Sequence, residues 1–228
     1  DQYKTVQGVA YIYVLAAIYK TSLMIRVTFI FSLFMFLACK GQTDKSKENP
    51  SLSKMRNVIF NDNLLIKDSI AKNYFMQGLD AINFDGFVDA KKYFSKANEI
   101  EKNNPIILNG LANVINKLGD SLQAQTLYLQ AISIDSNYVI SYVNYGNYLR
   151  QRHQLDKAKN VLLQGFRFNP SDQEKTGLYY NLAMVNLNLN KCDEAIECAN
   201  KAKSFTPNQT EKESLTGFVQ EIKSLCGN

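Results

Sequence analysis

Four cysteines and one histidine are the side chains in this 228-residue chain that are best able to bind a metal or to form a covalent bond. They are Cys39, Cys192, Cys198, Cys226 and His153. No pair of cysteines has the two-residue separation that is typical of zinc sites, and the histidine is far from every cysteine in the sequence. The sequence therefore predicts no metal site.

The sequence also lacks the common motifs of catalytic sites. It contains no glycine-rich phosphate loop, no GxSxG turn and no HExxH pair. Asp120, Asp156 and Asp193 are near the expected starts of helices, where a carboxylate stabilises the helix N-terminus without any catalytic role. We therefore expect neither an enzyme nor a cofactor.

The charge of the chain is weakly basic and evenly distributed. There are 26 Lys and Arg residues and 21 Asp and Glu residues, which gives a formal net charge of +5. The basic residues do not gather into a stripe of the kind that binds nucleic acid, so we expect no nucleic-acid partner.

The first 38 residues differ in composition from the rest, and we expect them to be a leader. Residues 9–19 are uncharged, but they are fewer than the roughly 20 residues that a membrane-spanning helix needs. Residues 27–38 form a second uncharged segment, which follows Arg26 and has the length of a secretory signal core. A signal peptide over residues 24–38 that starts at Met24 explains this order, and residues 1–23 are then an over-extended reading frame.

Cys39 directly follows Ala38 and precedes a polar stretch that cannot form a core. This junction resembles the lipobox of bacterial lipoproteins, although Phe36 and Leu37 depart from the Leu and the small residue that the family prefers there. The resemblance implies a lipid on Cys39, a flexible tether over residues 39–56 and a location on a membrane of the bacterial cell envelope, with the outer membrane as the expected one. An uncleaved membrane helix that ends near Cys39 is the alternative.

Four stretches of the chain share a spacing of alanines. Ala90, Ala124, Ala158 and Ala195 are separated by 34, 34 and 37 residues. This spacing, with the residues around it, resembles the tetratricopeptide repeat, a 34-residue pair of antiparallel helices. The resemblance places repeats at 71–104, 105–138, 139–172 and 176–209, inside a solenoid over residues 57–209.

Small and large residues alternate where the helices of such repeats touch. A small residue at position 8 lets the two helices of a repeat approach, alanines at positions 20 and 27 do the same, and bulky residues at positions 4 and 24 fill the remaining space. The four repeats place the following residues at these positions: Tyr74, Gly78, Ala90, Phe94, Ala97; Leu108, Ala112, Ala124, Tyr128, Ala131; Tyr142, Gly146, Ala158, Leu162, Gly165; Tyr179, Ala183, Ala195, Ala199, Ala202. The expected fold is an all-α, right-handed superhelical solenoid of about four helix pairs.

Residues 210–228 have apolar residues at helical spacing and predict a helix that caps the last repeat. Cys226 follows this helix, and an oxidising compartment would permit a disulfide from Cys226 to Cys192 or Cys198. Three separate thiols are the other interpretation, and the spacing of the cysteines does not decide between them.

The first helices of tetratricopeptide repeats line a concave groove that binds protein or peptide partners, and the resemblance implies the same here. It places the following residues in the groove: Phe75, Leu79, Ile82, Asn109, Asn113, Asn116, Val143, Asn147, Arg150, Tyr180, Met184 and Asn188. Asparagine amides can bind an extended peptide backbone because each offers both a donor and an acceptor. We therefore expect a membrane-tethered scaffold that binds a protein or peptide. An accessory factor that binds cell-wall glycan is the alternative.

Overall fold

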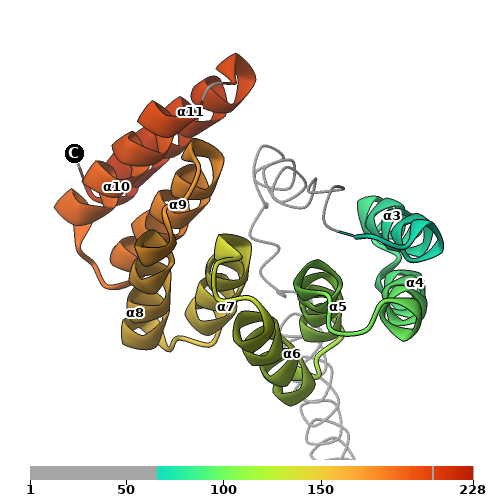
Figure 1. Ribbon diagram of the computed structural model, residues 1–228. Coiled ribbons are helices and arrows are strands. Elements are labelled where there is room, and N and C mark those ends of the chain that lie inside the picture. The colour runs from blue at the N-terminus through green and yellow to red at the C-terminus, as the bar shows by residue number, and fades with distance from the viewer. Residues whose placement is uncertain (1–65, 207, 228) are drawn as a thin grey trace, which may run out of the picture. The chain divides into compact units, whose positions relative to one another are not determined.

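The computed structural model describes residues 66–206 and 208–227, which belong to one compact unit and contain helices and turns only. Within this part of the chain, α3 to α10 form four antiparallel pairs in chain order, and α11 packs against the last pair (Figure 1). The elements are α3 (Ser69–Asn83), α4 (Phe87–Ile100), α5 (Pro105–Lys117), α6 (Ser121–Ile134), α7 (Val139–Gln151), α8 (Leu155–Gly165), the 3-10 turn η1 (Phe166–Phe168), α9 (Asp172–Asn188), α10 (Cys192–Phe205) and α11 (Gln209–Leu225).

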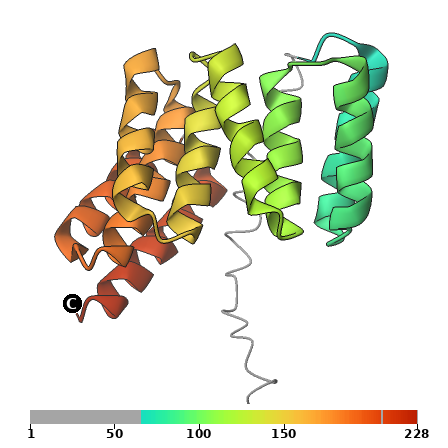
Figure 2. The same ribbon diagram turned by 90° about the horizontal axis from the view of Figure 1, so that it is seen from below.

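The predicted fold class, an all-α solenoid of helix pairs with a terminal capping helix, is confirmed. Figure 2 shows α3 to α8 side by side, with the turns between them at the two ends of the helices. The predicted leader, the tether and Cys39 lie outside the described residues, as does Pro207.

The two helices of a pair come close together because one of them carries a very small residue where they cross. A Cβ added to Gly78 would lie 2.5 Å from Cε1 of Phe94, and one added to Gly146 would lie 2.5 Å from Cγ of Leu162. Phe94 and Leu162 are fully buried, so the surrounding core holds both side chains in place. Each glycine at position 8 is therefore matched to the large residue at position 24 of the same repeat.

The turn inside each pair uses the same helix-ending geometry. The residues with positive φ in these four turns are Asp85, Gly119, His153 and Asn190. In the third turn, the N–H of His153 donates to the carbonyl of Arg150 and the N–H of Gln154 donates to the carbonyl of Leu149, which is a Schellman motif. His153 has a φ of 56° and is exposed to solvent. Its role is to end α7, because histidine tolerates the left-handed conformation better than most residues.

Three extra residues between the third and fourth repeats lengthen α9 at its N-terminus. Ser171 caps this helix, with its hydroxyl accepting from the N–H of Glu174 while the Glu174 carboxylate accepts from the N–H of Ser171. The capping box starts α9 at Asp172, so the helix has one more turn before Thr176, the first residue of the predicted repeat. The junction between the third and fourth repeats therefore differs in geometry from the junctions before it.

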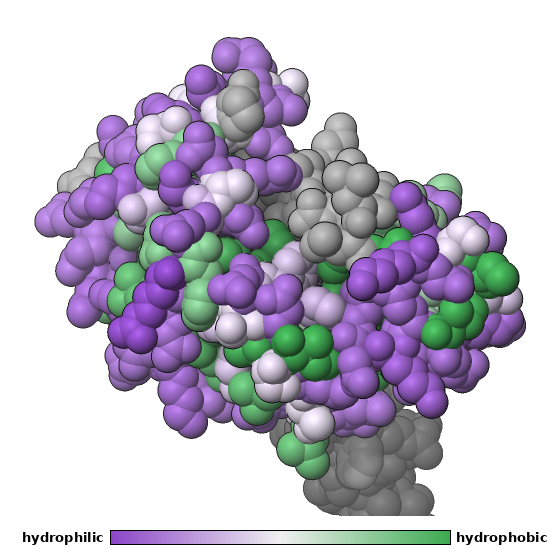
Figure 3. Space-filling model, viewed as in Figure 1, coloured by the Kyte–Doolittle hydropathy of each residue, from purple (hydrophilic) through white to green (hydrophobic). Residues whose placement is uncertain are grey.

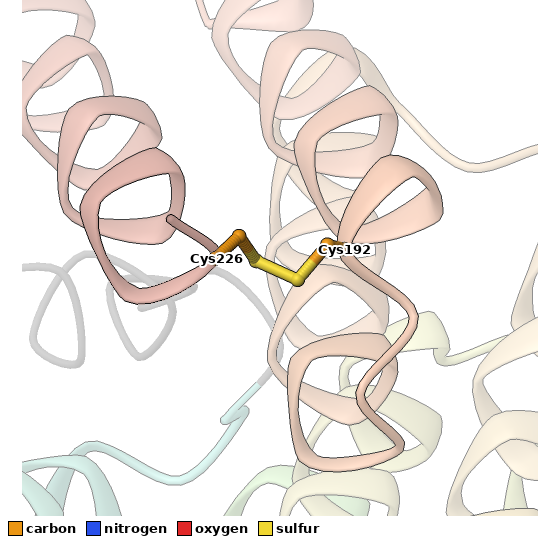
Figure 4. Close-up of a disulfide and its surroundings, with 2 residues drawn as sticks. All are labelled: Cys192 and Cys226. Atoms are coloured by element: carbon orange, nitrogen blue, oxygen red, sulfur yellow. A yellow bond between two sulfur atoms is a disulfide. The ribbon is translucent and has the colours of Figure 1, made fainter. Parts of the chain in front are cut away.

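The capping helix α11 is packed against α10 and joined to it covalently. Its apolar face meets the alanine face of α10, in a cluster that contains Ala195, Ala199, Ala202, Leu215, Phe218, Val219 and Ile222. Cys192, at the start of α10, and Cys226, just after α11, form a disulfide with their Cα atoms 5.9 Å apart (Figure 4). Cys198 remains a free thiol. It follows Cys192 by six residues, which places it about 240° around the axis of α10 and so on a different side of the helix.

We expect Gly146→Ala to destabilise the fold by about 1–3 kcal/mol, because the new methyl group would overlap Leu162. Gly217→Ala is the matched control, since Gly217 lies inside α11 with no atom within 4 Å of an added Cβ, and this change should stabilise by up to about 1 kcal/mol. Urea unfolding of both variants measures the difference. Equal effects of the two substitutions would contradict the role given to position 8.

We expect loss of the disulfide to lower the stability of the C-terminal pair. Closing a loop between residues 34 apart in sequence stabilises by about 3–4 kcal/mol in the chain-entropy model. A Cys192→Ala, Cys226→Ala double variant should therefore unfold at a lower temperature and lose its response to reductant. Cys198→Ala serves as the control and should keep both the wild-type melting temperature and the reductant response.

Candidate protein-binding surface

Three of the twelve residues predicted to line the groove lie in the core, which corrects their assignment. The exposed fractions of Phe75, Asn109 and Val143 are 1%, 1% and 2%. Phe75 packs on Phe94 with ring centroids 5.1 Å apart, and Val143 belongs to the same main core cluster. These positions point between helices rather than to solvent, so they support the surface without forming it.

Four further predicted residues are partly buried against core side chains. They are Leu79 and Ile82 on α3, which pack on the main core, and Tyr180 and Met184 on α9, which pack on the cluster around α11. The ring of Tyr180 lies 4.7 Å from that of Phe218 on the capping helix. Tyr180 and Met184 therefore help to hold the cap in place.

The remaining predicted residues keep some exposure, and three of them form a polar group on the inner helices α5 and α7. The Asn113 carbonyl oxygen accepts from the Tyr128 hydroxyl at 2.5 Å, and the Asn147 carbonyl oxygen accepts from Arg150 at 2.9 Å. Burial raises the pKa of Tyr128, so its hydroxyl stays protonated and remains a donor. The Nδ2 groups of Asn113 and Asn147 have no hydrogen-bond partner within the described residues, which leaves two amide donors for a ligand.

Other amide side chains on α5 form hydrogen bonds to side chains of α7 instead of facing a ligand. Asn109 donates to the Ser141 hydroxyl at 2.8 Å and so ties α5 to α7 inside the core. Asn116 donates to Gln151 at 3.1 Å at the other end of the same two helices. The sequence predicted that these asparagines bind a peptide, and it did not predict their partners within the fold. The available signal was Ser141, a polar residue within the apolar segment VISYV. Asn188 is exposed at the end of α9.

The inner helices α5 and α7 carry cationic side chains and no acidic ones. Their charged residues are Lys117 and Arg150, and Arg152 follows at the end of α7. Figure 3 shows that the visible face is mainly hydrophilic, with hydrophobic side chains in separate small areas. The surface on α5 and α7 therefore offers amide donors and positive charge, which suits a peptide backbone with acidic side chains.

The aspartates that could be taken for catalytic residues have structural roles at the starts of helices. Asp120 caps α6, and Asp156 and Asp193 lie in the first turns of α8 and α10, which confirms their predicted place at helix starts. Within the described part of the chain, no three metal-ligating side chains come together. In the same part, none of the helices is both long and apolar enough to cross a bilayer.

Comparisons with known proteins agree with this architecture. Models of the tetratricopeptide repeat match residues 127–160 and 176–209, and the second range is that of the fourth predicted repeat. The human protein O-mannosyl-transferase TMTC3 is 32% identical over 111 residues, which are 48% of this chain and 12% of the human protein.

Solved structures give a second comparison. Pseudomonas aeruginosa pilF has a TM-score of 0.57 at 22% identity, over 70% of this chain and 76% of that one. A MamA structure (41-end) from Desulfovibrio magneticus RS-1 has a TM-score of 0.49 at 22% identity, over 70% of this chain and 89% of the other. The pilF likeness supports the fold alone. The matches to the repeat models, with the four helix pairs, identify this chain as a tetratricopeptide repeat protein.

Proposed function

We propose that this chain is a scaffold that binds a protein or peptide partner through α5 and α7 while its N-terminus is anchored to a bacterial envelope membrane. The observation that carries the binding role is a pair of amide donors, on Asn113 and Asn147, that have no hydrogen-bond partner among the described residues and lie on helices that lack acidic residues. An extended peptide fits this surface when its carbonyls accept from the two amides and an acidic side chain lies near Arg150.

Binding rather than catalysis is the role that the described residues support. Among the described residues, Glu197 and Lys201 have shifted pKa values, and they form an exposed ion pair with each other. Such a pair explains the lowered pKa of the carboxylate and the raised pKa of the amine without an active site. The alignment with the human mannosyltransferase covers too little of that protein for its activity to be carried over.

An envelope location is supported by two independent features. The disulfide between Cys192 and Cys226 is of the kind that persists in oxidising compartments such as the bacterial periplasm. The apolar segment before Cys39 has the length of a secretory signal core, and the polar stretch after it suits a tether. We propose that the lipid on Cys39 is the membrane anchor.

The binding surface is tested by changing Asn113 and Asn147 to Asp. This change removes the two Nδ2 donors and adds negative charge, but it keeps the oxygens that accept from Tyr128 and Arg150, so the fold should be retained. After crosslinking in the native envelope and affinity capture, we expect the double variant to recover specific partners at least tenfold less than wild type. Asn160→Asp, on the exposed side of α8, is the matched control. Equal recovery by the double variant and the control would disprove the proposed surface.

The anchor is tested separately with Cys39→Ser. We expect wild type to incorporate a labelled fatty acid and to fractionate with membranes, and the variant to lose both properties, because the lipid is attached to the cysteine sulfur. A variant that stays in the membrane fraction and retains residues before position 39 would favour the uncleaved helix instead.

A further inference from the structure

A cavity of about 540 Å³ lies between α8 and α10, away from the surface on α5 and α7. Its base is formed by α9, and its apolar walls come from Leu163, Phe166, Tyr179 and Leu182. Its polar lining includes Lys159, Asn186 and Cys198. The helices that surround this cavity, α8, α9 and α10, lie together in Figure 1.

The preceding junction of the solenoid shows what fills the corresponding space. There, Tyr145 on α7 is 8% exposed, and its hydroxyl accepts from Gln125 on α6 at 3.3 Å. The residues equivalent to this pair in the next repeat are Leu182 and Lys159, since they follow by the repeat spacings of 37 and 34 residues. The tyrosine ring of one junction is thus replaced by a shorter leucine at the next.

A second replacement enlarges the same space. Cys198 on α10 occupies the position that Val161 holds on α8 and Leu127 holds on α6. All three side chains are partly buried and pack on the core, and that of Cys198 is the smallest. The cavity therefore corresponds to the space that the Tyr145 side chain fills at the preceding junction.

The chemistry of the lining fits a phenol ring. The Phe166 and Tyr179 rings lie 4.8 Å apart at a tilt of 53°, and an added ring would extend this aromatic cluster. Asn186 is only 3% exposed, and its oxygen is 3.4 Å from the Lys159 amine. The Lys159 amine is not within ion-pair distance of a carboxylate in the described residues, so it can donate to an oxygen on a ligand.

Two carboxylates, Glu194 and Glu197, also line the cavity, and neither forms an ion pair with Lys159 in the described part of the chain. Lys201 pairs with Glu197 at 2.6 Å and lies over the Tyr179 ring. Burial raises the pKa of the Cys198 thiol, which leaves a neutral group in the wall beside Asn186. Lys159 is then the one charged donor in the lining that is not already engaged with a carboxylate, and it stands at the position of the glutamine that binds the Tyr145 hydroxyl.

We infer that the cavity between α8 and α10 is a binding site for a tyrosine side chain of a partner polypeptide. The ring lies against Phe166 and Tyr179, and the phenol oxygen accepts a hydrogen bond from Lys159. This site is separate from the surface on α5 and α7, so it stands whether or not that surface binds a peptide.

Cys198 provides a direct reporter, because it lies in the cavity wall and is the free thiol among the described cysteines. The probe is p-cresol, which is the side chain of tyrosine, and the measurement is the rate at which N-ethylmaleimide alkylates Cys198 in the purified full chain under non-reducing conditions. Peptide mapping separates this site from any other thiol. We expect saturating p-cresol to slow alkylation of Cys198 at least fivefold, and toluene to protect less, because it lacks the oxygen that Lys159 binds.

Two variants test the site from opposite walls, and each introduces the residue found at the equivalent position of the preceding repeat. Leu182→Tyr copies Tyr145, and it should slow alkylation without p-cresol and remove the effect of p-cresol. Cys198→Val copies Val161, and it should weaken p-cresol binding at least tenfold. NMR spectra measure this binding through the amide shifts of residues in α8 and α9. Circular dichroism checks that each variant is folded. Absence of protection in wild type, or full binding by the folded Cys198→Val protein, would overturn the proposal.

The polypeptide source is tested with two blocked pentapeptides, Gly-Gly-Tyr-Gly-Gly and Gly-Gly-Ala-Gly-Gly. We expect the first to protect Cys198 and the second to leave its alkylation rate unchanged. Protection by p-cresol without protection by the tyrosine peptide would reject a polypeptide ligand.

Discussion

The close crossing of the two helices inside each repeat is the contact on which the rest of this structure depends. Gly78 and Gly146 let α4 and α8 approach α3 and α7 so closely that the Cβ of a larger residue would overlap Phe94 or Leu162. Once the helices of a pair are fixed, their remaining faces must be covered by the next pair, because one pair alone cannot bury its apolar residues. The solenoid is the result, and it continues until α11 and the disulfide end it.

The departures from regular repetition are where the protein gains binding chemistry. The second and third repeats join through a filled interface, with Tyr145 held by Gln125 among other tyrosine rings. The third and fourth repeats join through a longer spacing, a capping box at Ser171 and a shorter side chain at Leu182. A repeat that fills its own interface contributes stability, whereas one that leaves a shaped space can recognise a ligand.

Much of the fold could be read from the sequence, because the same small residues recur where helices cross. The alanine spacing located the pairs, and the apolar pattern after residue 209 located the capping helix. The surface was harder to predict, because a residue at a groove position can turn either outward or into the neighbouring helix. Phe75 and Val143 turned inward to fill the core, and Asn109 found Ser141 as a partner. That choice depends on which neighbour has room, which one repeat considered by itself does not reveal.

The cysteines show the same dependence on a neighbouring element. The sequence left both Cys192 and Cys198 open as partners of Cys226, although they lie on one helix and face different sides of it. Cys198 is three residues after Ala195 and one before Ala199, the buried alanines of α10, so helical phase turns it toward the core of the solenoid. Cys192 is at the first turn of α10, where the end of the antiparallel α11 arrives. The disulfide therefore locks the cap without using the thiol in the cavity wall, and the end of the solenoid can be rigid while the cavity beside it stays open to a partner.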